Sequence, residues 1–188
     1  MKKGIFKTIA LSIFLIALVS VSQPALAQSL IFAQIEGIEG SGGASQECDG
    51  CIQVLGLGLS IGHTAGTSGG GSTSGKAEFR PLKILKEIDI ASPKIYLAAA
   101  KGTHIPQMNI NFYTQGDSSL DIYYELLLED VVITNVTPSV NSSEGGAMTE
   151  LVSFMFGKIT WTYTPYKEDG SKEPAVTTHW DLELNQGG

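Results

Sequence analysis

Apolar and polar residues alternate along much of this chain, and this two-residue period constrains the fold more than any other feature. The clearest case is Ile52–Ile61. One face is apolar and the other is mainly glycine: Leu55, Leu57, Leu59 and Ile61 against Val54, Gly56, Gly58 and Ser60. Because successive side chains of a strand point to opposite faces, the pattern predicts a strand with one buried face. A glycine face indicates strong bending or the close approach of another backbone.

Segments with strand character continue to the end of the chain. The expected strands are Leu30–Glu36, Lys76–Ile84, Gln107–Gln115, Leu120–Val136, Leu151–Thr164 and His179–Leu184. Leu120–Val136 is too long for one straight strand, so we expect it to bend. Glycine-rich or turn-forming segments separate the strands: Gly37–Gly50, Gly66–Gly75, Asn141–Gly146 and Lys167–Lys172. The last contains Asp169-Gly170, a hairpin signal.

One short helix interrupts this pattern. Ser92 can cap a helix, Pro93 suits its first position, and Gly102 can end it. We therefore expect a helix of about two turns over Lys94–Lys101. Many short strands with one short helix predict an all-β fold, a sandwich or a barrel.

The first residues have the pattern of an export signal. Lys2, Lys3 and Lys7 precede the apolar run Ile9–Val21, and Ala25-Leu26-Ala27 places small residues where signal peptidase reads them. We expect cleavage between Ala27 and Gln28, which leaves one domain over residues 28–188 in the periplasm or outside the cell. The alternative is an uncleaved anchor, although the run is short for a bilayer core of about 30 Å. No cysteine follows the small residues, so a lipoprotein is not expected, and no membrane span is expected after cleavage.

The charge balance bears on the partners of the chain. The 188 residues carry 12 Lys and Arg against 19 Asp and Glu, and three of the lysines lie in the predicted signal. An acidic surface argues against binding to nucleic acid or to anionic membranes.

The two cysteines of the chain, Cys48 and Cys51, lie three residues apart in a polar loop. A zinc site needs two more ligands, and His63, His104 and His179 show no metal spacing. A thioredoxin-like site needs a βαβ context, which this pattern does not predict. In an oxidising compartment the expected state is a local disulfide, and a redox-active pair is the alternative.

Other motifs carry little chemistry. Gly70–Lys76 has the spacing of a P-loop, but Ala77 replaces the Ser or Thr that would hold magnesium, and a strand-like segment follows where a helix is required. The sequence therefore predicts no bound cofactor and no metal site.

The possible catalytic side chains also have structural explanations. Glu125, Glu129 and Asp130 could form paired carboxylates for hydrolysis, or one side of a strand that faces solvent or a neighbouring subunit of a ring. His104 is expected to stabilise the turn after the helix, since no nucleophile accompanies it. Trp161, Tyr163 and Trp180 are expected in the core or at an interface between subunits. The sequence thus predicts a protein that is not an enzyme.

Four segments in this order carry a resemblance to a known family. They are IFAQIEGIEG, IQVLGLGLSIG, ASPKIYLAAAKGTHIPQMNINF and FGKITWTYTPYKEDGSKEPAVTTHWDLELN. Together they resemble Hcp, the haemolysin-coregulated tube protein of type VI secretion, over about residues 31–185. The resemblance implies a non-enzymatic structural protein that forms hexameric rings. Its fold would be two packed β-sheets closed into a β-barrel, with one helix on the side.

The resemblance also implies partners. Family rings stack into a tube that delivers effector proteins and works with spike and sheath components. By the same resemblance, Gly37–Gly50 would be the element between rings, although Cys48 and Cys51 depart from the family pattern there. The export signal keeps a second hypothesis open, namely an exported binding or adhesion module with the same fold that acts outside a type VI apparatus.

Overall fold

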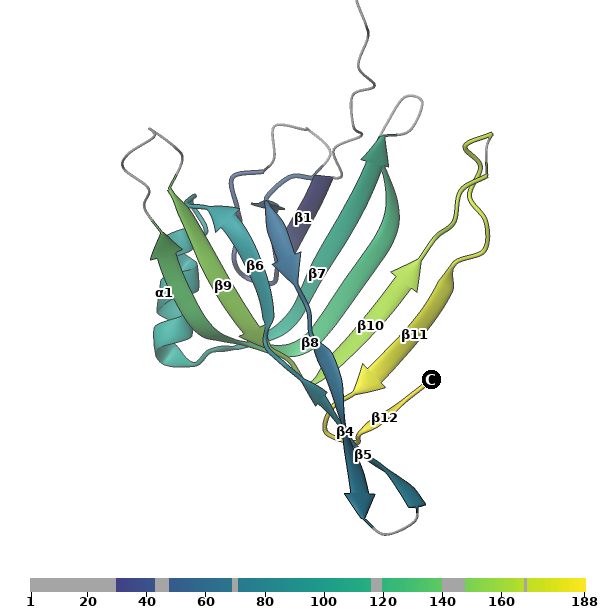
Figure 1. Ribbon diagram of the computed structural model, residues 1–188. Helices are drawn as coiled ribbons and strands as arrows, with labels where there is room; N and C mark the ends of the chain where they lie inside the picture. Colours follow the sequence, from purple (N-terminus) through teal and green to yellow (C-terminus); the bar gives the residue numbers. More distant parts are fainter. Residues whose placement is uncertain (1–29, 43–47, 69–70, 116–119, 140–147, 168) are drawn as a thin grey trace, which may run out of the picture.

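The computed structural model describes residues 30–42, 48–68, 71–115, 120–139, 148–167 and 169–188 (Figure 1). Most of these residues lie in strands, and one helix stands beside the sheet. In chain order the elements are β1 (Leu30–Ile35), β2 (Ile52–Val54), β3 (Gly56–Gly58), β4 (Ile61–Ser68), β5 (Gly71–Phe79), β6 (Leu82–Glu87), α1 (Ser92–Lys101), β7 (His104–Gln115), β8 (Leu120–Ser139), β9 (Thr149–Met155), β10 (Lys158–Tyr163), β11 (Val176–Asp181) and β12 (Gln186–Gly187).

Strand β8 connects the two halves of the main sheet. Its first part pairs with β7 on one side and with β10 on the other, and its last part, from Val132 to Ser139, pairs with β9. One half of the sheet therefore has the order β12-β11-β10-β8-β7-β1-β2, and the other continues from β8 through β9 and β6 to β3. Strands β4 and β5 form a separate hairpin. The predicted all-β class with one short helix is confirmed.

The expected bend in Leu120–Val136 is also confirmed. Asp130 has a φ of 52°, a left-handed conformation that a non-glycine residue seldom adopts. The pairing of β8 with β9 shifts register shortly afterwards, between Ile133 and Asn135. The strand thus turns from one half of the sheet into the other at Asp130–Asn135.

Of the two forms expected, the described residues have the packed sheets of a sandwich and do not form the closed barrel that the family resemblance implies. The β-ladder is interrupted where the chain passes from β2, which pairs with β1, to β3, which pairs with β6. In addition, β10, β11 and β12 extend the sheet sideways from β8 to a free edge. The result is a strongly bent, open sheet whose two halves pack face to face.

The same interruption corrects the alternation expected for Ile52–Ile61. Ile52 and Val54 are buried, whereas Leu55 is 47% exposed. Leu57 and Leu59 again face inward as expected and pack against the core, whereas Ile61 is 51% exposed. The chain changes its pairing partner at Leu55, and this step places Leu55 and Gly56 outside in succession.

Two other sequence predictions are wrong in this region. Gly66–Gly75 was expected to be a loop, but much of it belongs to the β4–β5 hairpin, whose ladder runs from the pair Ile61–Phe79 to the pair Ser68–Gly71. The strand expected over Lys76–Ile84 is divided between β5 and β6. Pro81 lies at the break, where a residue without an N–H cannot continue a ladder.

Helix α1 begins at Ser92 and ends at Lys101. Gly102 adopts the left-handed conformation at its C-terminus, with a φ of 61°, as expected for the glycine that ends a helix. The capping role predicted for Ser92 is wrong. The N-cap residue is Ala91, which makes no side-chain cap, and the Ser92 side chain instead joins a buried polar network.

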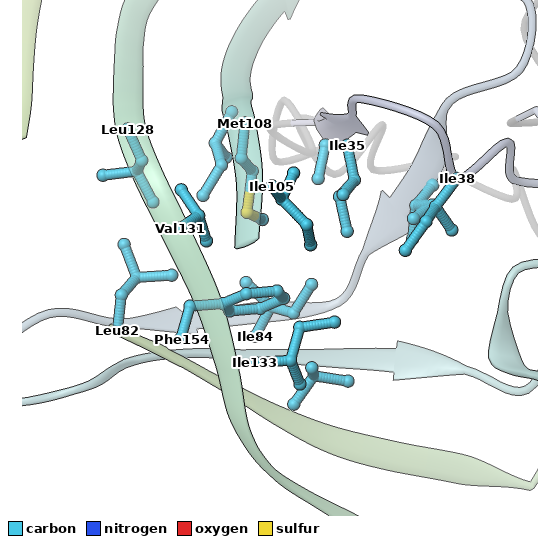
Figure 2. Close-up of a cluster of buried hydrophobic side chains, with 14 of the residues drawn as sticks. Ile35, Ile38, Leu82, Ile84, Ile105, Met108, Leu128, Val131, Ile133 and Phe154 are labelled. Carbon is cyan, nitrogen blue, oxygen red and sulfur yellow. The ribbon is translucent and has the colours of Figure 1, made fainter. Parts of the chain in front are cut away.

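The main core lies between the two halves of the bent sheet. Leu128 and Val131 of β8 point toward Ile84 of β6 and Phe154 of β9, and Phe154 is paired with Ile133 of β8 in the ladder (Figure 2). Isoleucine and leucine dominate this cluster, in keeping with the β-branched and apolar strands of the sequence. A second, smaller cluster of Phe32, Cys48, Cys51 and Tyr113 lies on the opposite face of β1 and β7.

Gly40 packs too closely for any side chain. An added Cβ atom would overlap the carbonyl oxygen of Cys51 and the side chain of Ile52. We therefore expect Gly40→Ala to lower the free energy of unfolding by about 1–3 kcal/mol, the usual cost of overpacking. Urea denaturation followed by tryptophan fluorescence measures this. Gly62→Ala is the matched control, since its nearest neighbour would lie at 3.9 Å; equal stability of both variants would contradict the packing.

Candidate functional site

A buried ion pair joins the sheet to the start of the helix. Lys86 of β6 and Glu150 of β9 are both fully buried, and Lys86 Nζ lies 2.7 Å from Glu150 Oε1. The Lys86 ammonium also donates to Asp89 Oδ1 at 2.7 Å and to the Glu87 carbonyl at 2.7 Å. Burial of charges is costly unless they are paired and hydrogen-bonded, and this arrangement satisfies both conditions for Lys86.

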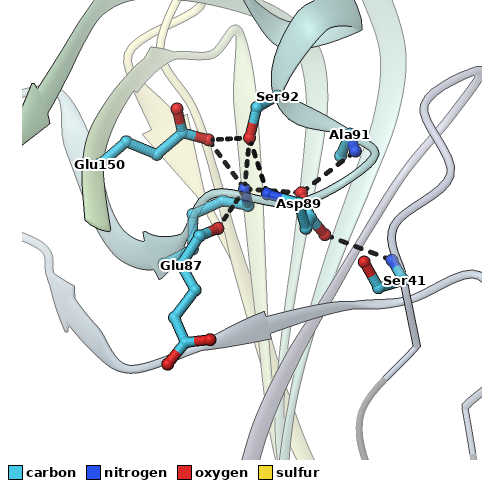
Figure 3. A network of polar contacts seen from close by, with 7 residues as sticks. Ser41, Glu87, Asp89, Ala91, Ser92 and Glu150 are labelled. Carbon is cyan, nitrogen blue, oxygen red and sulfur yellow. Dashed lines mark hydrogen bonds and ion pairs between the residues drawn. The ribbon is translucent and has the colours of Figure 1, made fainter. Parts of the chain in front are cut away.

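Ser92 and Asp89 extend this network toward α1 (Figure 3). The Ser92 hydroxyl donates to Glu150 Oε1 at 2.8 Å and accepts from the Asp89 backbone N–H at 3.1 Å. Asp89 Oδ1 accepts from the Ala91 N–H at 3.0 Å, and Asp89 Oδ2 from the Ser41 N–H at 3.2 Å. The network thus fixes the turn before the helix and attaches the β1–β2 loop to it.

Two pKa values respond to this environment. A hydrogen bond to the Glu150 carboxylate raises the pKa of Tyr96 to about 12, with smaller contributions from burial and from the negative charge. Glu150 Oε2 makes no hydrogen bond of ordinary geometry. The contact between the Glu150 carboxylate and Tyr96 is therefore weak. Partial burial acts to raise the pKa of Asp89, but the bonds from Lys86, Ser41 and Ala91 outweigh it and lower the pKa. Lys86, Asp89 and Ser92 are fully partnered within the network, whereas Glu150 Oε2 is buried without an ordinary hydrogen bond.

Aromatic side chains hold the C-terminal strands against the body. Phe79, at the end of the β4–β5 hairpin, stacks between Trp161 and Trp180, with ring centroids 6.4 and 6.5 Å apart. It also meets Phe156 edge-on at 6.0 Å. Trp161 and Trp180 are thus packed against the core, which was one of the two roles expected for them, whereas Tyr163 is 49% exposed.

The cysteine pair lies in the smaller cluster. Cys51 is fully buried and Cys48 is 7% exposed, beside the edge-to-face pair of Phe32 and Tyr113. Their sulfur atoms are in contact and their Cα atoms lie 5.5 Å apart, a separation that a disulfide spans. The disulfide itself stays a prediction.

The candidate catalytic residues do not form a catalytic arrangement. His104 Nδ1 lies 2.8 Å from Asp130 Oδ1, but both side chains are exposed, by 71% and 56%. This contact ties the first residue of β7, just after the helix exit, to the bend of β8, and both side chains are open to solvent.

The carboxylates of β8 are also separated. Glu129 forms a cross-strand ion pair with Lys158 at 2.9 Å. Glu125 lies four residues earlier on the same strand, which is about 13 Å away. Two carboxylates that cooperate in glycoside hydrolysis stand about 5–9.5 Å apart. Glu125 and Glu129 therefore belong to the solvated side of the strand, the alternative that the sequence left open.

The P-loop spacing has no P-loop structure. Gly71–Lys76 lies in the extended strand β5, where the ladder pairs it with β4, and no helix follows Lys76. The sequence could not show this directly, but the strand-like residues after Lys76 already argued against a phosphate site. Ala27 and Gln28 lie outside the described residues, so the cleavage site stays a prediction.

Concave surface is present near the cysteine loop. An open hollow of about 740 Å³ is lined mainly by polar side chains of β1, β7 and the loop, including Gln34, Glu36, Glu39, Asp49, Gln107 and Asn109. In the part of the chain that the structure describes, no helix is long and apolar enough to cross a membrane, and no group of His, Cys, Asp or Glu has a metal-binding arrangement.

Comparison with known proteins identifies the family of the chain. The model of the family described as "Type VI secretion system effector, Hcp" matches residues 32–163, which is most of the chain. The chain belongs to the Hcp family of type VI secretion proteins.

Two relatives from Pseudomonas aeruginosa are similar to this Hcp family member. The protein named "Protein hcp1" is 28% identical over 111 residues, which cover 58% of this chain and 68% of that protein. The "Major exported protein" is 30% identical over 109 residues, covering 55% of this chain and 63% of its own length. The chain therefore matches a little under two thirds of the second relative.

Solved structures show the Hcp fold. One solved structure, described as "Structure of a type six secretion system protein", matches with a TM-score of 0.78 and 21% sequence identity. The match covers 86% of this chain and all of that chain. Hcp1 from Salmonella typhimurium has a TM-score of 0.69 at 26% identity, covering 87% of this chain and all of that chain.

The buried ion pair gives a test with a built-in control. Lys86→Met leaves the Glu150 carboxylate buried without its cation, so we expect a loss of about 3–5 kcal/mol in the free energy of unfolding. The double variant Lys86→Met with Glu150→Leu removes both charges and should recover most of that loss. Urea denaturation measures both. A single variant within 1 kcal/mol of the natural chain would contradict the role given to the pair.

The cysteine pair is tested by thiol titration. We expect protein recovered from an oxidising compartment and denatured without reductant to give no free thiols, and two after reduction. Two free thiols before reduction would contradict the predicted disulfide between Cys48 and Cys51.

Proposed function

We propose that this chain is an exported structural subunit that assembles into hexameric rings, and that the rings stack into a tube for delivery of effector proteins. The Hcp family match over residues 32–163 is the observation that carries this proposal. Spike and sheath components are the further partners that it implies. The proposed role is not enzymatic, in keeping with the solvent-open His104–Asp130 pair and the separated carboxylates of β8.

The β4–β5 hairpin is the proposed contact between rings. It projects beyond the bent sheet at one end of the molecule (Figure 1). The family resemblance suggested Gly37–Gly50 for this role, but the described ends of that loop fold back on each other. Gly40 N–H donates to the Gly50 carbonyl at 2.8 Å, and Gly42 N–H to the Cys51 carbonyl at 2.9 Å. A hairpin that stands away from the body is better suited to reach a neighbouring ring.

Export by the N-terminal signal is part of the proposal. The basic residues, apolar run and small residues that end at Ala27 support cleavage before Gln28. A signal of this kind carries the chain out of the cytoplasm before it folds, so rings of the mature chain would form after export. This observation also favours the second candidate function, an exported binding or adhesion module that acts outside a type VI apparatus.

Light scattering coupled to size exclusion distinguishes these functions. We expect the mature chain, recovered after export, to have the mass of six copies and to begin at Gln28 by mass spectrometry. A strict monomer at all concentrations would contradict the ring and favour the binding module. Recovery of the chain with Met1 intact would contradict export and leave the ring hypothesis standing.

A further inference from the structure

The two cysteines stand at the ends of a tight turn immediately before β2. Gly50 reverses the chain between them with a φ of 68°, and the Cys48 and Cys51 sulfur atoms are in contact. Cys51 is fully buried and Cys48 is 7% exposed, and both belong to the smaller apolar cluster on β1 and β7. The Gln34 side chain of β1 donates to Cys48 Sγ at 3.7 Å. We call Cys48–Cys51 the cysteine turn.

The cysteine turn holds the other described part of the β1–β2 loop. Gly40 donates its N–H to the Gly50 carbonyl at 2.8 Å, and Gly42 donates its N–H to the Cys51 carbonyl at 2.9 Å. The contact is close, because a Cβ atom added at Gly40 would overlap the Cys51 carbonyl. The first half of the loop therefore lies directly on the backbone of the cysteine turn.

The same loop reaches the buried ion network beside the helix. Ser41, which lies between the two glycines held by the cysteine turn, donates its N–H to Asp89 Oδ2 at 3.2 Å. Asp89 Oδ1 in turn accepts from Lys86 Nζ and from the Ala91 N–H. Residues 40–42 are thus held by the cysteine turn on one side and by the network on the other, and opening of the turn would release the first side.

A bond between the two sulfur atoms would keep the turn closed. Gly40, Ser41 and Gly42 contribute no apolar side chain, so the position of this loop depends on its hydrogen bonds and on the turn that accepts two of them. Backbone hydrogen bonds open readily where few apolar contacts support them. A cross-link removes chain entropy from the open state, even when the loop that it closes is short.

The setting of the pair favours a bond that forms once and then persists. Cys51 has no exposed surface and Cys48 is nearly covered, so an outside thiol has little access to either sulfur atom once the turn is folded. Asp49 lies between them and is exposed, and its negative charge disfavours the approach of the thiolate that thiol–disulfide exchange requires. A catalytic redox pair has the opposite setting, with an accessible cysteine in electropositive surroundings.

We propose that the cysteine pair is a redox latch that closes the β1–β2 loop once, after export. As the bond forms, the Cys48 and Cys51 thiols lose two protons and two electrons. The oxidant is the disulfide of a thiol–disulfide exchange protein in the outer compartment, which is reduced to two thiols. The cytoplasm keeps thiols reduced, so the latch stays open until the chain has left it. This inference rests on the proposed export.

The latch also forms part of the polar hollow on β1 and β7. Asp49 and Gly50 of the cysteine turn line this hollow, together with Gln107 and Asn109 of β7. Opening of the turn would remove that part of its wall. A latch that closes only after export therefore gives the exported chain a surface that its precursor in the cytoplasm lacks.

Hydrogen exchange, measured by NMR on the chain recovered after export, tests the latch. The comparison is with the same chain reduced in urea and refolded with dithiothreitol. We expect the amides of Gly40, Ser41 and Gly42 to exchange faster in the reduced chain by about tenfold or more, because the turn that holds the loop opens. The buried residues Ile110 and Leu128 report unfolding of the whole chain, and their exchange should change less.

Two results of this comparison would overturn the latch. One is equal exchange of the loop amides in the oxidised and reduced chains. The other is an increase of the same size in the loop and in the core, which would mean that the bond only stabilises the fold as a whole. Cys48→Ala with Cys51→Ala removes the bond without adding a buried hydroxyl. This variant should show the fast loop exchange of the reduced chain and no response to dithiothreitol.

The rate of reduction of the folded chain tests closure in one direction. Asp49→Lys places a positive charge beside Cys48 and should speed reduction by dithiothreitol about tenfold, because the charge attracts the attacking thiolate. Glu183→Lys, an exposed position between β11 and β12, is the matched control and should leave the rate unchanged. Equal rates in the two variants would contradict the protection assigned to Asp49.

Failure of the latch and failure of export give different results. Two free thiols in a chain that begins at Gln28 would overturn the latch and leave export standing. A chain with Met1 intact whose loop exchange still depends on reduction would overturn export, and with it the timing of closure, while the latch itself would be confirmed.

Discussion

The fold depends on one strand that belongs to both halves of the sheet. Strand β8 has 20 residues, and its pairing changes from β7 and β10 to β9 as it passes the bend. Leu128, Val131 and Ile133 lie on the two sides of that bend and meet in one core. Because a single strand directs both halves toward each other, the bend near Asp130 determines how the sheet encloses its apolar residues and where its edges lie.

The buried ion network has a comparable role for the helix. Lys86 and Glu150 come from neighbouring strands β6 and β9, at directly paired positions, and both point away from solvent. Ser92 brings the first residue of α1 to this pair, and Asp89 attaches the β1–β2 loop through Ser41. A network of this kind is weak evidence for stability in itself, but it specifies one arrangement of the groups that it joins. Here it sets the position of the helix beside the sheet.

Much of the fold could be predicted from local patterns. The two-residue alternation of apolar and polar residues identified most strands. Gly102 identified the end of the helix, and the length of Leu120–Val136 indicated that this strand bends. Most of the errors have a common physical origin, because they depend on which strands pair with each other. The glycine tract Gly66–Gly75 has the composition of a loop but forms a ladder with its partner strand, and Leu55 turns outward where the chain exchanges β1 for β6. Nothing in the local sequence marks Lys86 and Glu150 as buried, because only the strand register places them opposite each other in the interior.

The proposed redox latch follows from those same tertiary features. The burial of Cys51 beside Phe32 and the bonds of Gly40 and Gly42 to the cysteine turn are visible only once the fold is known. Electron microscopy of the mature chain recovered after export tests the central claim, that this is a ring-forming Hcp subunit. The account predicts class averages of rings with six-fold symmetry and an open centre. Particles with the size of one chain, and no rings at any concentration, would contradict it.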